Sequence, residues 1–206
     1  MSFEYDLLNL KKLHYDLEKQ MLQFDEIIPF ERQTTAKIFS PRLLNMMLVC
    51  GPQIEGTAEL ISECFNFKTS RKDIPELIRK INFEGVLSNF KIVTVSHNIL
   101  FTPFPKNLEW WRTYNDLKHE LAEKQSEITY TVVMNALAAL AALHRLANAI
   151  KGTSTENLEH ILDKQYWDKT FEVRIGNQTG SAIGIPPPWK SKTFKISNYF
   201  VYNPNC

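Results

Sequence analysis

The sequence has few cysteines, almost no net charge and no uncharged run of apolar residues as long as a membrane span. Its three cysteines, Cys50, Cys64 and Cys206, show neither Cys-x-x-Cys nor Cys/His ligand spacing, which argues against a disulfide framework and against structural zinc. With 24 Lys and Arg against 23 Asp and Glu, the formal charge is +1, so nucleic-acid binding would require a local basic patch. Free thiols favour a reducing, cytoplasmic location.

Neither a leader peptide nor a membrane span is expected. Residues 1–20 carry charges throughout and lack the apolar core of a signal peptide. The longest uncharged apolar stretch, Ile128 to Leu143, is interrupted by Asn135 and is shorter than the roughly 20 residues that cross a bilayer. We predict a buried helix there, and no membrane partner.

The composition predicts a globular, mainly α-helical protein. The chain has 206 residues, of which 44% are hydrophobic and 12% aromatic, enough for one domain with a small appendage. Apolar residues recur at three- and four-residue steps, the period of an amphipathic helix. Helices are predicted over residues 3–24, 41–65, 74–81, 108–125 and 127–150, with a small β-rich insertion over 89–104.

Two features refine these helices. Ser40-Pro41 supplies an N-cap and a proline at the first helical position, whereas Gly51-Pro52 predicts a kink or a short break inside the second helix. The helix over 127–150 is alanine-rich, so it should lie centrally in a bundle. His144 is expected near the end of that helix, where the helix dipole favours a cation.

The chain is expected to divide into a helical bundle over 1–150 and a β-rich appendage, packed on the bundle, over 151–206. Residues 171–175 and 193–202 read as extended segments, with a turn over 176–180. Pro186, Pro187 and Pro188 form a polyproline II stretch between them.

One segment carries residues suited to chemistry. On a helix, Arg112, Asn115, Asp116 and His119 fall at i, i+3, i+4 and i+7 and therefore share a face. A histidine with a pKa near ~6.5 can transfer a proton at neutral pH, and an arginine can hold a phosphate in bidentate fashion. RNA supplies its own nucleophile, the 2′-hydroxyl, so these groups could support phosphodiester cleavage without a metal or a phosphate-binding loop.

The motif WWRTYNDLKHE, with an Arg-x6-His spacing at Arg112 and His119, followed by an alanine- and leucine-rich helix, resembles the HEPN (higher eukaryote and prokaryote nucleotide-binding) superfamily. The resemblance covers residues 1–150 and implies a bacterial HEPN-like helical bundle. It also implies a homodimer whose motif helices meet in a cleft. Active members are metal-independent endoribonucleases that serve as toxins of toxin-antitoxin systems or in phage defence.

Carried over to this sequence, the resemblance assigns phosphate stabilisation to Arg112 and proton transfer to His119, with Asn115 as a polar assistant. Lys118, Trp111 and Tyr114 are the candidate substrate-binding residues. No metal and no cofactor are expected. RNA, a second copy of the chain, and an antitoxin or defence protein are the expected partners.

Other interpretations of the same residues remain open. Arg112 and Asp116 could form an ion pair on a solvated helix face, or the face could bind a ligand without catalysis. Trp110 and Trp111 could stack on bases or pack in the core. Glu55, Glu59 and Glu63 form a row that faces either the motif helix or solvent.

Two further questions are metal binding by the histidines outside the motif and the functions other than a nuclease. His14, His97 and His160 have no second ligand at helical or hairpin spacing, so metal binding is not expected at them. The alternative to a nuclease is a catalytically silent HEPN-like dimerisation or adaptor module in a defence or stress system. Binding of a nucleotide or small ligand between the helices is a third interpretation.

Overall fold

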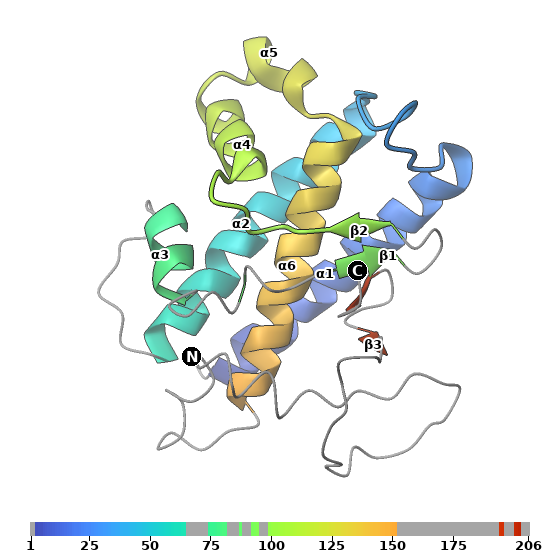
Figure 1. Cartoon of the computed structure of the whole chain (residues 1–206). Helices are drawn as coiled ribbons and strands as arrows, with labels where there is room; N and C mark the ends of the chain where they lie inside the picture. The colour runs from blue at the N-terminus through green and yellow to red at the C-terminus, as the bar shows by residue number, and fades with distance from the viewer. Residues whose placement is uncertain are drawn as a thin grey trace.

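The computed structural model describes residues 3–64, 74–81, 87, 92–94, 99–151, 194–195 and 200–202. In these residues the protein is mainly α-helical (Figure 1). The six α-helices are α1 (Phe3–Ile27), α2 (Pro41–Cys64), α3 (Ile74–Ile81), α4 (Glu109–His119), α5 (Leu121–Lys124) and α6 (Tyr130–Lys151). A short 3-10 helix, η2 (Gln125–Glu127), joins α5 to α6.

The core lies where α1, α2 and α6 pack together, with α2 and α6 in the most extensive contact (Figure 1). Alanines on α6 allow this close packing, and Ala136, Ala138, Ala139 and Ala142 are fully buried. The segment Tyr130–Asn148 is long and apolar enough to span a membrane, but 83% of it is buried inside the protein. The predicted central, buried helix is therefore confirmed.

The start of α6 is held by the segment that precedes α2. The backbone N–H groups of Tyr130 and Thr131 donate to the carbonyl oxygens of Ile38 (2.9 Å) and Ala36 (3.0 Å). These bonds satisfy amides that the helix itself leaves without acceptors. The hydroxyl of Tyr130 also donates to the buried Asp25 carboxylate at 2.9 Å, which ties the beginning of α6 to the end of α1.

A small antiparallel sheet completes the fold. Its strands are β1 (Ile92–Thr94), β2 (Leu100–Phe101), β3 (Phe194–Lys195) and β4 (Phe200–Tyr202), arranged in the order β2-β1-β4-β3. Strands β1 and β2 lie within the predicted insertion over 89–104, and β3 and β4 lie within the predicted extended segment over 193–202. Pairing of Val93 with Val201 brings the C-terminal part of the chain back to the insertion.

Two details of the helix predictions were wrong. The helix α2 runs through Pro52 without the predicted break, and a kink at that position stays a prediction. The helix predicted over 108–125 ends at His119, because Glu120 has φ −134° and ψ 48°. The carbonyl of Glu120 then accepts the N–H groups of Glu123 and Lys124, which begins α5.

The remaining predictions for the C-terminal part lie outside the described residues. These include the extended segment over 171–175, the turn over 176–180 and the polyproline stretch over 186–188. The division of the chain at residue 150 stays a prediction.

Candidate functional site

The motif helix α4 is fixed to the bundle by its aromatic face. Trp110, Trp111, Tyr114 and Leu117 are buried. The indole Nε1 of Trp110 donates to the carbonyl oxygen of Pro103 at 2.7 Å, which anchors the first turn of the helix to the preceding loop. The Trp111 ring lies 6.2 Å from that of Trp110 and 5.4 Å from that of Tyr114, measured between centroids.

A glycine on α2 allows α4 to approach. A Cβ atom built on Gly51 would lie 2.1 Å from Cζ of Tyr114, so the Tyr114 ring occupies space that any other residue at position 51 would fill. Burial, together with the nearby Glu55 carboxylate and Cys50, raises the pKa of the Tyr114 hydroxyl. The glycine at position 51 therefore sets the distance between α2 and α4.

The opposite face of α4 carries the predicted catalytic residues. Arg112 and His119 are exposed, and Asn115 and Asp116 are half-buried. The ion pair between Arg112 and Asp116, one of the alternative interpretations, is not formed, and the Arg112 guanidinium makes no hydrogen bond or salt bridge with any described residue. The guanidinium is thus available to a ligand.

Lys118 has partners within the protein. Its Nζ lies 2.7 Å from Oε1 of Glu55 and 5.2 Å from the centroid of the Tyr114 ring. Glu55 therefore does face the motif helix, as one of the sequence interpretations held, but its partner is Lys118 and not Arg112. Glu63, further along the same row, is exposed.

Arg112 lies on the rim of a groove between α3 and the start of α4. This α3–α4 groove has a volume of about 640 Å³. It is lined by Pro75, Glu76, Ile78, Arg79, Phe104, Pro105, Lys106, Asn107, Leu108, Trp111 and Arg112. His119, seven residues further along α4, is not among the lining residues, so the groove contains one member of the predicted catalytic pair.

The aromatic candidates for substrate binding are placed mainly in the core. Trp111 is 7% exposed and Tyr114 is 2% exposed, which favours the packing interpretation over base stacking. Trp111 nevertheless contributes to the wall of the α3–α4 groove. Tyr114 is covered by Lys118 and Gly51, so its role as a substrate-binding residue stays a prediction.

Among the described residues, no group of three or more His, Cys, Asp and Glu side chains could hold a metal ion. The helical-end role expected for His144 was wrong, because α6 continues to Lys151 and His144 is buried. Its ring stacks on that of His14, a contact that sequence spacing does not reveal. Arg79 and Lys106, which line the groove, were also missed, since they lie on separate elements.

Comparison with known proteins gives no relative: no family model, no curated protein and no solved structure matches the chain.

Proposed function

We propose that the protein is a HEPN-like, metal-independent endoribonuclease that uses Arg112 and His119, and that it acts as a toxin or in phage defence. The observation that carries the proposal is the state of Arg112. Its guanidinium is exposed on the rim of a groove and has no partner among the described residues. The ion pair with Asp116 that the alternative interpretation offers is not formed, which leaves the guanidinium to meet a phosphate.

The spacing of the two residues suits one scissile phosphate. Seven residues of helix correspond to a rise of about 10 Å, and both side chains leave the same side of α4. A phosphate lying over Asn115 could therefore contact both residues. The long Arg112 side chain would reach it from the N-terminal side and the His119 imidazole from the C-terminal side. Asn115, which is half-buried between them, would donate an amide hydrogen bond to a phosphate oxygen.

In the proposed reaction the 2′-oxygen attacks the neighbouring phosphorus and the bond from phosphorus to the 5′-oxygen breaks. The products are a 2′,3′-cyclic phosphate and a free 5′-hydroxyl. One proton leaves the 2′-hydroxyl and one is added to the departing 5′-oxygen; His119 transfers one of them and solvent water exchanges the other, while Arg112 stabilises the negative charge that develops on the phosphate oxygens. The protein supplies positioning and charge, and the substrate supplies the nucleophile.

A homodimer is part of the proposal. Leu121 follows His119 closely in the chain and is 50% exposed, and none of the residues of α5 is buried. A second copy that met the end of α4 would cover this apolar side chain and remove it from water. Light scattering coupled to size-exclusion chromatography would measure the mass, with Leu121→Glu as the variant expected to shift it towards the monomer.

The nuclease is tested by incubating the wild-type chain, Arg112→Ala and His119→Ala with a mixed-sequence RNA in excess EDTA. Cleavage by the wild type alone, with fragments that end in 2′,3′-cyclic phosphate, is the expected result. Both residues are exposed, so neither substitution should alter folding, and circular dichroism would check this. Equal cleavage by all three proteins would refute the assignment of these residues.

One observation favours the second candidate, a catalytically silent HEPN-like adaptor module. His119 is not among the described residues that line the groove with Arg112, so this groove does not bring the two residues together. An adaptor would bind a defence or antitoxin protein through this face of α4. Inert wild-type protein in the RNA assay, together with an unchanged complex for Arg112→Ala, would replace the nuclease by this function.

A further inference from the structure

The α3–α4 groove has a rim of cations. Arg79 on α3, Lys106 before α4 and Arg112 on α4 all line it, and Glu76 is the one acidic residue among the lining residues that the structure describes. The charged side-chain groups of Lys106 and Arg112 form no ion pair or hydrogen bond with described residues. The chain as a whole carries a formal charge of only +1, so this groove is a local basic patch on a nearly neutral protein.

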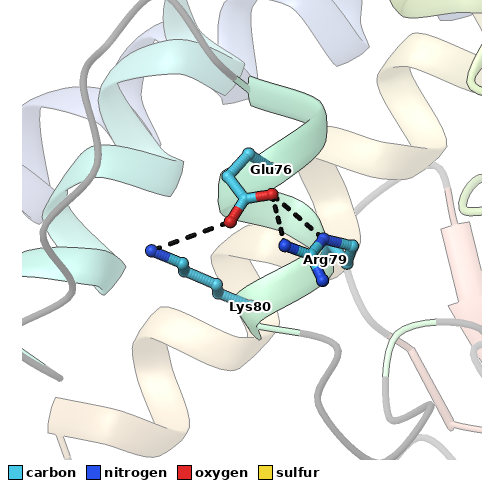
Figure 2. Close-up of polar contacts among 3 residues, drawn as sticks. All are labelled: Glu76, Arg79 and Lys80. Atoms are coloured by element: carbon cyan, nitrogen blue, oxygen red, sulfur yellow. Dashed lines mark hydrogen bonds and ion pairs between the residues drawn. The ribbon is translucent and has the colours of Figure 1, made fainter.

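Two neighbouring cations compensate the negative charge of the Glu76 carboxylate in the groove. Figure 2 shows Glu76 between Arg79 and Lys80 on α3. Arg79 donates to Oε2 of Glu76 from Nε at 3.0 Å and from Nη2 at 2.5 Å, and Lys80 Nζ lies 3.7 Å from Oε1. The hydrogen bond from Arg79 is the largest of the effects that lower the pKa of Glu76. The carboxylate therefore holds Arg79 in place at the rim and leaves the positive charge of Lys106 and Arg112 uncompensated.

The floor of the groove is apolar. Ile78, Phe104 and Trp111 are buried beneath it, and Leu108 is half-buried. Asn107 adds an exposed amide that can both donate and accept hydrogen bonds. A basic rim above an apolar, partly aromatic floor is the arrangement that binds single strands, whose phosphates meet the cations while the unpaired bases lie on the apolar surface.

We propose that the α3–α4 groove binds a stretch of single-stranded RNA, with Lys106, Arg79 and Arg112 on its phosphates. The proposal rests on the proposed nuclease and deepens it, since the groove leads the strand to Arg112 and from there along α4 to His119. A base-paired duplex does not fit the same contacts, because its bases are stacked inward and cannot reach the floor. The substrate class is thus unpaired RNA.

The test measures RNA affinity separately from cleavage. In the His119→Ala chain, fluorescence anisotropy with a labelled 12-nucleotide oligouridine gives the dissociation constant, and Lys106→Glu and Arg79→Glu are compared with Lys19→Glu. Lys19 is an exposed lysine on α1 outside the groove, so it provides the same change of charge. We expect the two groove variants to bind roughly tenfold more weakly, with a salt slope lower by about 0.7 for each lost phosphate contact, and Lys19→Glu to bind as the parent does.

Every other outcome overturns the proposal. Equal loss of affinity in Lys19→Glu would mean that only net charge matters, and no measurable binding at low salt would mean that the groove is not an RNA site. Duplex RNA bound as tightly as oligouridine would exclude the role of the apolar floor, and competition by polyglutamate at equal charge would indicate an unselective polyanion surface. Failure of the nuclease remains distinguishable, because it appears as absent cleavage in EDTA while anisotropy still reports groove-dependent binding.

Discussion

The imidazole rings of His14 and His144 stack in the core between α1 and α6, with centroids 4.7 Å apart and planes inclined by 6°. Nε2 of His14 lies 3.5 Å from Oε1 of Glu18, and neither ring nitrogen of His144 has a hydrogen-bond partner in the described part of the chain. Burial lowers the pKa of His14 to about 4 despite the nearby carboxylate. Burial first, and then the charges of His14 and Lys11, lower the pKa of His144 to about 2.

This pair predicts that the protein loses stability in mild acid. In the unfolded chain both histidines take up protons as the pH falls through about 6.5, whereas in the folded chain they stay neutral until well below that pH. The unfolded state therefore binds more protons, and the free energy of unfolding should fall by about 1.4 kcal/mol per pH unit for each histidine between pH 6.5 and about 4. Urea unfolding at pH 7.5, 6.5, 5.5 and 4.5 measures it.

The matched variant for this prediction carries His14→Phe and His144→Phe, which keeps two stacked rings but removes both titrating groups. Its unfolding free energy should decline much less than that of the wild type over the same pH range. The difference between the two proteins isolates the histidines from the carboxylates, which titrate in both. Parallel pH profiles for the two proteins would exclude the histidine pair as the cause.

The contact between Gly51 and Tyr114 predicts opposite effects for two glycine substitutions on α2. In Gly51→Ala the new Cβ would lie 2.1 Å from the Tyr114 ring, so α4 must shift, at a cost of about 1–3 kcal/mol or more. In Gly56→Ala the nearest atom is Cδ2 of Leu10 at 3.6 Å, an ordinary contact. That variant should be more stable by about 0.5–1 kcal/mol, since alanine favours a helix interior.

Thermal unfolding of both glycine variants measures the prediction. Gly51→Ala should also weaken RNA cleavage, because α4 carries Arg112 and His119 at a distance from α2 that the glycine sets. Equal stability of Gly51→Ala and Gly56→Ala would show that the Tyr114 ring does not pack against position 51.

The helices were predictable from the sequence because their signals are local. The apolar period of residues 3–24 and the Ser40-Pro41 start of α2 both lie within the elements they define. The end of α4 was not predictable, since Glu120 is neither glycine nor proline and its residue type gives no local signal for the non-helical backbone that it adopts. The role of Gly51 was mistaken for that of a helix break because its partner, Tyr114, lies on another helix.

In the candidate site, too, features within one helix were predictable and contacts between separate elements were not. The shared face of Arg112 and His119 follows from helical spacing alone, and the structure leaves both exposed on α4. The pairing of Lys118 with Glu55 and the grouping of Arg79 with Lys106 depend on contacts between elements distant in the chain. Spacing within one helix cannot reveal such contacts, and the histidine pair escaped prediction for the same reason.

The ion pair between Lys118 and Glu55 predicts a small, measurable coupling. The two side chains are 38% and 23% exposed, so solvent screens the pair and its contribution should be about 0.5–1 kcal/mol. A double-mutant cycle with Lys118→Met and Glu55→Gln gives the coupling from urea unfolding. If Lys118 binds substrate, as the sequence resemblance predicts, Lys118→Met should raise KM for RNA and leave kcat unchanged, because a binding residue transfers no proton. A lowered kcat would instead place it in the chemical step.

The substitution Arg112→Lys should slow RNA cleavage and leave RNA affinity nearly unchanged. Lysine keeps the positive charge at the groove, so the anisotropy of oligouridine should report an affinity close to that of the parent. It lacks the planar, bidentate guanidinium that can hold two phosphate oxygens as charge develops on them, so the cleavage step should slow by about a hundredfold. Single-turnover cleavage in EDTA, with protein in excess, measures that step without product release.

The matched control is Lys106→Arg, which changes a cation at the same groove without touching the proposed chemistry. It should bind and cleave as the wild type does, because Lys106 is proposed to hold a phosphate by its charge alone. If Arg112→Lys cleaved at the wild-type rate, a positive charge would suffice at position 112. Arg112 would then act in strand binding, together with Lys106 and Arg79, and the stabilisation of the transition state would have to come from another group.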